Sequence, residues 1–144
     1  MVKADAAAPR LFALVPCAGV GERAGQQIPK QYAPIGARSM VAHTLAALAR
    51  VARLHATLVV LSPGDTQFAA QAPDFRGERA WVAACGGATR AASVGNGLSE
   101  LIHRGARSGD WVLVHDAARC LLQPEWVDRL VDACADDAVG GLLA

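Results

Sequence analysis

The chain has 144 residues, of which 53% are hydrophobic and 19% are charged, and its formal net charge at pH 7 is +1. This composition excludes an intrinsically disordered chain, and this length supports one domain whose core needs no metal or disulfide. The balanced charge argues against a broad basic face for nucleic acid. Since no apolar run reaches the roughly 18 residues of a spanning helix, we expect no membrane partner.

The N-terminus and the cysteines place the chain among cytoplasmic enzymes. Residues 1–10 are Ala-rich but lack the apolar core and cleavage site of a signal peptide, so we interpret them as a flexible leader before one domain over 11–144. The cysteines are far apart and form no Cys-x-x-Cys pair: Cys17, Cys85, Cys120 and Cys134. This spacing predicts reduced thiols rather than a zinc site or a disulfide framework.

Four short apolar runs predict strands that are buried on both faces, as in a parallel sheet. They cover residues 11–15, 57–61, 81–84 and 111–114. A further run begins at 142–144, which we interpret as the start of a fifth strand in a truncated chain. An ordinary C-terminal tail is the alternative.

Helical patterns follow the strands. They cover residues 40–48, 89–102 and 123–135. Ser39 is a candidate N-cap and Pro124 suits a first helical turn, whereas Gly95 and Gly97 weaken the middle pattern. Strands alternating with helices predict an α/β fold with an open, doubly wound, mostly parallel sheet, which binds ligands beyond the carboxyl ends of its strands.

The loop after the first strand combines small residues with two cations. Gly19 and Gly21 permit positive φ and remove the Cβ that would block a phosphate, so that successive N–H groups can face an anion. Arg23 and Lys30 bracket this loop, and Pro29 stiffens the backbone beside Lys30. Fixed cations beside such a cradle favour phosphoryl or nucleotidyl transfer, because they neutralise charge on the transferring phosphorus.

Other interpretations of the glycines remain open at this point. A plain tight turn or a solvated Lys30 would explain each feature alone. A dinucleotide-binding fold expects an acid about 20 residues further on, yet no Asp or Glu lies between Glu22 and Asp65. The Gly-Lys-Ser/Thr pattern of a Walker loop is also absent.

Two further loops carry candidate ligand groups. Gly86 and Gly87 follow the third strand and can bring backbone groups close to a flat base, with Arg90 or Ser93 adding a side-chain contact. The alternative is a simple helix entry with Thr89 as the cap and Arg90 on the surface.

The fourth strand ends at a candidate metal ligand. Asp116 lies where a strand-end carboxylate can hold Mg²⁺, which needs only one or two carboxylates. We expect His115 to be packed or hydrogen-bonded rather than a metal ligand. Arg119 either grips a phosphate or pairs with an acid, and we favour the phosphate.

Five motifs in order carry a family resemblance. They are Pro16-Cys17-Ala18-Gly19-Val20-Gly21-Glu22-Arg23, Pro29-Lys30-Gln31-Tyr32, His43-Thr44-Leu45, Gly86-Gly87-x-x-Arg90-x-x-Ser93-Val94 and Val114-His115-Asp116-Ala117-Ala118-Arg119. Each is unspecific, but together, from about residue 11 to 144, they closely resemble the 2-C-methyl-D-erythritol 4-phosphate cytidylyltransferases of the non-mevalonate isoprenoid pathway. The resemblance implies a Rossmann-like fold of the nucleotide-diphospho-sugar transferase type.

The resemblance also implies a reaction, in which the phosphate of methylerythritol phosphate attacks the α-phosphorus of CTP and pyrophosphate leaves. It gives each matching position a role. Two cations would stabilise the transition state, Arg23 and Lys30, and the triphosphate would be wrapped by Cys17, Ala18, Gly19, Val20, Gly21 and Glu22. Cytosine would contact Gly87, Ala88 and Ser93, and Ala117 would line the nucleotide pocket. Asp116 would bind Mg²⁺ or another divalent cation, and Arg119 would face methylerythritol phosphate.

Three positions depart from the family's usual pattern. Cys17 stands where Ala is usual, and we expect this thiol beside the nucleotide to be open to oxidation or alkylation. Ala88 stands where Asp is common, so base recognition there would rest on backbone groups. Cys120 stands where Pro usually follows the arginine of the last motif.

Family members are appreciably longer than this chain. The resemblance implies that their second half supplies a further Lys near the phosphates, a second metal-site Asp, the remaining acceptor-binding residues and an arm that builds the homodimer. We therefore expect residues 11–144 to be a CTP-binding front portion that turns over methylerythritol phosphate poorly by itself.

Three alternative functions remain. A ribitol-phosphate cytidylyltransferase more often has Val at the position of Ala118 and Gly at those of Cys17 and Ala18, which favours the isoprenoid interpretation. A non-catalytic nucleotide-binding fragment would keep affinity for CTP without chemistry. A dinucleotide-dependent oxidoreductase is disfavoured by the missing acid.

Overall fold

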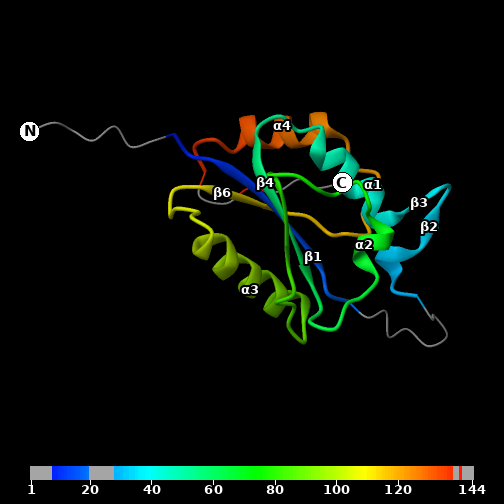
Figure 1. The fold of residues 1–144 in the computed structure, drawn as a ribbon. Helices are drawn as coiled ribbons and strands as arrows, with labels where there is room; N and C mark the ends of the chain where they lie inside the picture. Colours follow the sequence, from blue (N-terminus) through cyan, green and yellow to red (C-terminus); the bar gives the residue numbers. More distant parts are fainter. Residues whose placement is uncertain (1–7, 20–27, 138–139, 141–144) are drawn as a thin grey trace, which may run out of the picture.

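A four-stranded parallel sheet forms the centre of the computed structural model, which describes residues 8–19, 28–137 and 140 (Figure 1). Its strands are β1 (Leu11–Cys17), β4 (Leu54–Leu61), β5 (Ala80–Ala83) and β6 (Trp111–Val114). Their order across the sheet is β5-β4-β1-β6, and every neighbouring pair is parallel. The parallel sheet expected from the continuous apolar runs is thus confirmed.

Helices cover both faces of the sheet, as the doubly wound prediction requires. They are α1 (Met40–Ala49), α2 (Phe68–Gln71), α3 (Arg90–His103) and α4 (Pro124–Ala133). A 3-10 helix, η1 (Lys30–Tyr32), and a small antiparallel hairpin of β2 (Pro34–Ile35) and β3 (Arg38–Ser39) precede α1. None of the described helices is long and apolar enough to cross a membrane.

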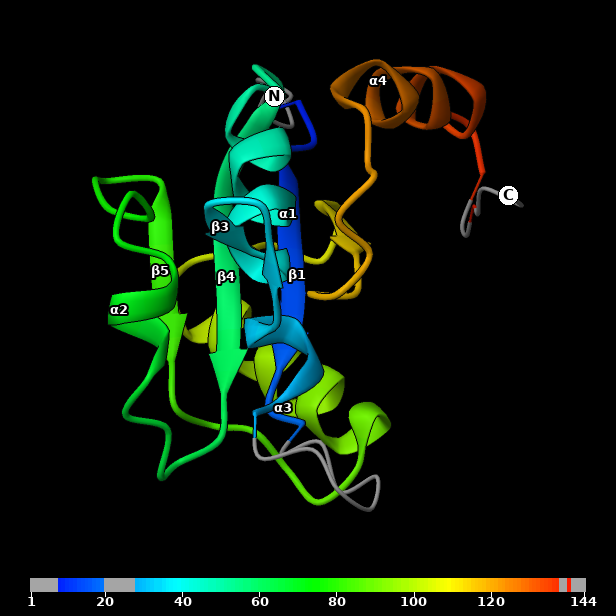
Figure 2. The same cartoon turned by 90° about the vertical axis from the view of Figure 1, so that its right-hand side faces the viewer.

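Alternate side chains of the central strands feed two cores. On one face Ala13 and Val15 of β1 pack in a cluster with Val41 and Leu48 of α1. On the other face the cluster comprises Phe12, Leu14, Ala56, Leu58, Val60 and Leu101. Figures 1 and 2 show α1 and α3 on opposite sides of the strands, which explains why the strands are apolar throughout.

The boundaries differ from the predicted ones where the local pattern is mixed. β4 begins at Leu54 rather than at residue 57, because exposed His55 between buried Leu54 and Ala56 interrupts the apolar run. The hairpin, η1 and α2 are too short to show a period, and the predicted elements do not include them. The possible fifth strand at 142–144 lies outside the described residues.

Gly97 in α3 is explained by close packing. A Cβ there would lie 2.7 Å from Leu14 Cδ1 and 2.8 Å from Val60 Cγ2, so a larger residue would push the helix from the sheet. Gly95, by contrast, would place its Cβ in open space. Helix α3 therefore keeps a residue of low helix propensity at Gly97 because the side chains of the sheet leave no room there for a Cβ.

The strand order positions the site. From β1 the chain moves outward through β4 to β5 and then returns to add β6 on the other side of β1. This reversal creates a topological switch point between β1 and β6, where doubly wound sheets bind ligands beyond the carboxyl strand ends. The loops after β1 and β6 flank that point.

Candidate functional site

The loops that follow the strands meet at the carboxyl edge of the sheet. The Ser62 hydroxyl, just after β4, donates a 2.5 Å hydrogen bond to the carbonyl of Ala18, just after β1. The N–H of Gly86, after β5, donates to the carbonyl of Leu61 at 2.8 Å. The N–H of His115, after β6, donates to the carbonyl of Leu14 at 3.0 Å. The predicted loops therefore share one edge.

Gln31 connects the start of the glycine-rich loop to its end. Its side-chain amide is buried and donates to the carbonyl oxygens of Gly19 at 2.7 Å and Cys17 at 3.4 Å. This bond holds η1, and hence the backbone of Lys30, beside the end of β1, while the Lys30 side chain is exposed. Lys30 is thus brought to the predicted edge.

Several predicted site residues fall outside the described residues. These are Val20, Gly21, Glu22 and Arg23. The shared hollow between Arg23 and Lys30 therefore stays a prediction.

The expected backbone role of Gly19 is only partly supported. Among the described glycines a positive φ occurs at Gly36, Gly77 and Gly105, so Gly19 does not use the positive φ that a glycine permits. The chain leaves β1 in a conformation that other residues can adopt. Among the described residues, no atom lies within 4 Å of the position that a Cβ at Gly19 would take, so the predicted phosphate contact there stays a prediction.

Cys17 differs from the reactive thiol that the sequence suggested. It is buried at the end of β1, and burial raises the pKa of its thiol to about 12, despite an opposing hydrogen bond with Tyr32. Tyr32 in turn donates a 2.5 Å hydrogen bond to Asp65, whose other carboxylate oxygen accepts from the N–H of Phe68. The burial of Cys17 therefore argues against ready oxidation or alkylation, because nucleophilic attack needs an accessible thiolate.

The Gly-Gly turn after β5 is required by packing. A Cβ at Gly86 would overlap the side chain of Ala18, and one at Gly87 would lie 2.6 Å from the Cβ of Ala92. The N–H of Gly87 donates to the hydroxyl of buried Ser93 at 3.0 Å. Ser93 thus holds the turn in shape, and its predicted contact with cytosine, like those of Gly87 and exposed Ala88, stays a prediction.

Helix α3 begins directly after this turn. Thr89 caps it by accepting from the N–H of Ala92 at 3.0 Å, which confirms the cap that the sequence suggested. Arg90, the first helical residue, reaches across to Asp116 after β6. The first turn of α3 therefore connects the predicted base-binding turn to the predicted metal ligand.

Asp116 lies between two guanidinium groups. Its Oδ1 accepts from Arg90 Nε at 2.8 Å and its Oδ2 accepts from Arg119 Nε at 3.0 Å. Partial burial alone would raise the pKa of this carboxyl, but the hydrogen bond and charge of Arg90, with those of Arg119, outweigh burial and lower it. Asp116 is therefore ionised at neutral pH.

The turn from residue 115 to 119 is fixed by its neighbours. The carbonyl of buried Ala117 accepts a 2.8 Å hydrogen bond from Thr44 Oγ1 of α1, and His115 Nε2 lies 3.0 Å from the carbonyl oxygen of Arg119. The prediction of a hydrogen-bonded His115 is confirmed. Arg119 pairs with an acid, the alternative that we did not favour, and its predicted phosphate contact stays a prediction.

The donor set fits a magnesium ion that keeps most of its waters. One ionised and partly exposed carboxylate stands at the edge, which is sufficient for Mg²⁺ beside phosphate oxygens. Within residues 8–19, 28–137 and 140, no group of three or more His, Cys, Asp or Glu residues could enclose a metal.

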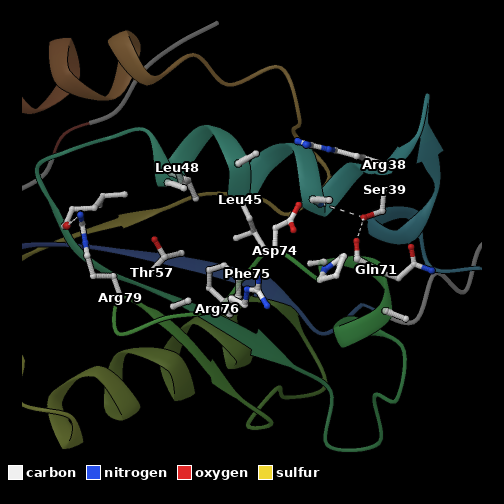
Figure 3. A pocket seen from close by; sticks show the side chains of 18 of the residues that line it. Arg38, Ser39, Leu45, Leu48, Thr57, Gln71, Asp74, Phe75, Arg76 and Arg79 are labelled. Atoms are coloured by element: carbon white, nitrogen blue, oxygen red, sulfur yellow. Dashed lines mark hydrogen bonds between the residues drawn. The ribbon is translucent and has the colours of Figure 1, made fainter.

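A separate groove of about 600 Å³ lies on the α1 face, beside the first half of β4 and the start of β5. Figure 3 shows Leu45 and Leu48 of α1 facing Thr57 and Phe75 across it. None of the predicted site residues lines this groove, whose walls combine apolar side chains with Arg38, Asp74, Arg76 and Arg79. We therefore place the candidate site at the carboxyl edge, where charged and hydrogen-bonding groups converge.

Sequence reasoning missed the residues that hold the edge together. Gln31, Thr44 and Ser62 each donate from a side chain to a backbone carbonyl that lies 12 or more residues away in sequence. Gln31 and Thr44 stand inside the recognised motifs, which was the only signal available. Ser62 lies in no recognised motif, and its contact with Ala18 depends on how β1 and β4 align.

A parallel α/β sheet with helices on both faces and loops gathered at its carboxyl edge defines a protein of the Rossmann-like α/β class. The family model of 2-C-methyl-D-erythritol 4-phosphate cytidylyltransferase matches residues 11–144, and the chain belongs to this family.

Curated relatives agree with this assignment. The chain is 58% identical over 94% of its length to a bifunctional IspD/IspF enzyme of Albidiferax ferrireducens, of which it covers 32%. It is 52% identical, again over 94%, to the 2-C-methyl-D-erythritol 4-phosphate cytidylyltransferase of Burkholderia multivorans, of which it covers 57%. The chain thus spans between a third and just over half of these relatives.

Solved structures share the fold. A 4-diphosphocytidyl-2C-methyl-D-erythritol synthase matches with a TM-score of 0.78 and 36% identity, covering 91% of this chain and 56% of that one. A CMP:2-keto-3-deoxy-manno-octonic acid synthetase complexed with CTP matches with a TM-score of 0.64 over 89% of this chain and 48% of that one. At 16% identity, this second likeness concerns the fold alone.

Proposed function

We propose that this chain carries the CTP-binding part of an enzyme that transfers a cytidylyl group from CTP to 2-C-methyl-D-erythritol 4-phosphate. Family membership over residues 11–144 supports the substrate class. The observation that carries the proposal is the convergence of the β1 loop, the Gly-Gly turn and Asp116 at one carboxyl edge.

The reaction is a substitution at phosphorus. A phosphate oxygen of the acceptor forms a bond to the α-phosphorus of CTP, and the bond to the β-phosphate oxygen breaks to release pyrophosphate. Negative charge accumulates at the reacting phosphates, so fixed cations stabilise the transition state. Lys30, held through Gln31 beside the end of β1, is proposed for this role together with Arg23.

The remaining proposed roles are those that the family resemblance implies for the matching positions. Residues 17–22 are proposed to wrap the triphosphate, with open space above Gly19 for a phosphate. Gly87, Ala88 and Ser93 are proposed to contact cytosine, and Ala117 to line the nucleotide pocket. The tight turn at Gly86 and Gly87 supports the proposed cytosine contacts, because its fixed shape would hold the same backbone groups toward the base each time CTP binds.

Asp116 is proposed to hold Mg²⁺, which when bound would neutralise charge on the triphosphate. Arg119 is proposed to turn toward the phosphate of methylerythritol phosphate. The exposed side chain of Arg119, with one side-chain bond in the described structure, supports that role.

Calorimetry with CTP tests the binding half of the proposal. The 144-residue chain should bind CTP with Mg²⁺, and Asp116→Asn should weaken this binding. Absence of CTP binding by the wild type would contradict the proposal, whereas NADH binding would favour an oxidoreductase.

A pyrophosphate-release assay on a family-length protein tests the chemistry. Methylerythritol phosphate should be the preferred acceptor, and preference for ribitol phosphate would replace the proposed substrate. The 144-residue chain should be much slower under the same conditions. Full turnover by this chain would contradict that expectation, and CTP binding without turnover at family length would leave a non-catalytic nucleotide-binding module.

We also propose that the family-length protein is a cytoplasmic homodimer. Light scattering on the purified protein tests the assembly, and a monomeric mass would contradict it. Cell fractionation tests the location.

A further inference from the structure

The two arginines beside Asp116 hold its carboxylate unequally. Arg90 contacts Oδ1 through two nitrogens, with a hydrogen bond from Nε at 2.8 Å and an ion-pair contact from Nη2 at 2.7 Å. Arg119 makes one contact with Oδ2, from Nε at 3.0 Å. The Arg119 side chain is also more exposed, at 76% against 59% for Arg90. The Arg90 pair is therefore the firmer of the two.

The backbones of the two arginines are anchored differently. Arg90 opens α3, whose start is capped by Thr89 and whose body packs on the sheet through Gly97 and Leu101. Arg119 belongs to the irregular turn after β6 and lies three residues from Asp116. Asp116 is thus fixed from α3 by Arg90, independently of its own turn.

The carboxylate leaves room for a cation on one side only. An ionised carboxylate offers about four lone-pair sites on its two oxygens. Two nitrogens of Arg90 crowd Oδ1, whereas a single nitrogen of Arg119 contacts Oδ2, so Oδ2 is the more open oxygen. A cation approaching Oδ2 would meet the positive charge of Arg119, which contacts that oxygen. Repulsion would displace Arg119 and leave Arg90 in place.

We propose that Arg90 is a positioning residue that stays on Asp116, whereas Arg119 leaves the carboxylate when a divalent cation binds and frees its guanidinium for a phosphate. This inference rests on the proposed function, since it concerns the same edge. Arg90 also follows the turn that Ser93 holds, so it ties the position of Asp116 to that of the predicted base-binding turn.

Arginine side-chain NMR tests the exchange without relying on activity. The Nε–H signals of the 144-residue chain are followed during addition of Mg²⁺ alone and then of CTP. We expect the Arg119 signal to shift and exchange faster with water, while the Arg90 signal persists. Loss of the Arg90 signal before that of Arg119, or no change in Arg119 once metal has bound, would overturn the inference.

Substitutions provide the second readout. Arg90→Gln should weaken Mg²⁺-dependent CTP binding by about tenfold or more, the usual loss when the group that orients a metal ligand is removed. Arg90→Lys should restore only part of it, because an ammonium lacks the guanidinium's planar pair of donors. Arg53→Gln is the matched control, since it removes an exposed pair with Asp132 of α4. Equal affinities for Arg90→Gln and the control would overturn the positioning role.

The two proposals fail in different ways. If the wild-type chain does not bind CTP, the proposed function is contradicted, and an Arg119 signal that Mg²⁺ alone leaves unchanged overturns the exchange as well. If CTP binds and Arg119 stays on Asp116 throughout, the proposed function stands and the exchange is overturned.

Discussion

Strand β6 has an aspartate near each end, and the two are used differently. Asp110 precedes the strand at the amino edge, where its side chain is 2% exposed and accepts from the backbone N–H groups of Arg10 and Arg107, both at 2.8 Å. Asp116 follows the strand at the carboxyl edge, where its side chain is 33% exposed. The guanidinium groups of Arg90 and Arg119 contact it there.

The difference separates a structural carboxylate from an available one. Backbone donors cannot leave Asp110 without unfolding the chain locally, and Arg10, which the sequence places in the leader, is tied to it by both backbone and side chain. The partners of Asp116 are exposed side chains, and Arg119 contacts it through a single nitrogen. An aspartate flanked by two arginines is therefore a candidate functional group only when at least one of its donors is an exposed side chain rather than a backbone group.

The largest expected effect falls on the chemistry of the carboxyl edge. In a family-length protein, Lys30→Ala or Arg23→Ala should lower kcat by about 10²-fold with less effect on KM for CTP, the loss expected for one preorganised transition-state donor. Steady-state kinetics measure this. Arg38→Ala, which removes an exposed cation beside the α1 groove, is the control and should leave kcat unchanged. An unchanged kcat with a raised KM would instead make Lys30 and Arg23 ground-state binders.

The next effect concerns stability at the amino edge. Asp110→Asn should lower the free energy of unfolding by about 2 kcal/mol, because buried hydrogen bonds to a charged group are lost. Asp116→Asn is the matched variant and should cost less than about 1 kcal/mol, as exposed ion pairs do. Urea denaturation compares them. Equal losses at the two positions would remove the distinction between the two ends of β6.

Acid should reveal the same contrast. Desolvation would raise the pKa of Asp110, but the backbone N–H groups of Arg10 and Arg107 and their guanidinium groups lower it well below its usual 3.8. A carboxyl whose folded pKa is depressed stabilises the protein above its unfolded pKa, and this contribution is lost as pH falls toward the folded value. Unfolding free energy should therefore drop below about pH 4 in the wild type and change less in Asp110→Asn. Parallel pH profiles would contradict this.

A smaller and local effect is expected at Cys17. Its burial and raised pKa, about 12, predict that a thiol reagent at pH 8 labels Cys120 first and leaves Cys17 unmodified until denaturant is added. Peptide mass spectrometry distinguishes the two thiols. Labelling of Cys17 as fast as Cys120 in the folded protein would show that the end of β1 opens readily.

The main elements were predictable because each carries a strong local signal. The apolar runs in β1 and β6 and the caps at Ser39 and Thr89 are properties of consecutive residues. The grouping of loops at one edge also follows from parallel strands. Gly97, by contrast, weakened the helix prediction, although its lack of a Cβ is what lets α3 pack against Leu14.

The details of the site were less predictable because they arise from contacts between distant segments. The burial of Cys17 depends on how η1 folds back over β1, and no local pattern records this. Whether Arg119 meets an acid or a phosphate depends on Arg90, which reaches Asp116 from another helix. Motif order identified the family, whereas the partner of each side chain required the structure.

A structure determined with Mg²⁺ and CTP tests the central claim most directly. We expect the triphosphate beside Gly19, Lys30 and Asp116, with the base at the turn of Gly86 and Gly87. A nucleotide seated in the groove between α1 and Phe75, or contacts that leave Lys30 and Asp116 untouched, would contradict the account.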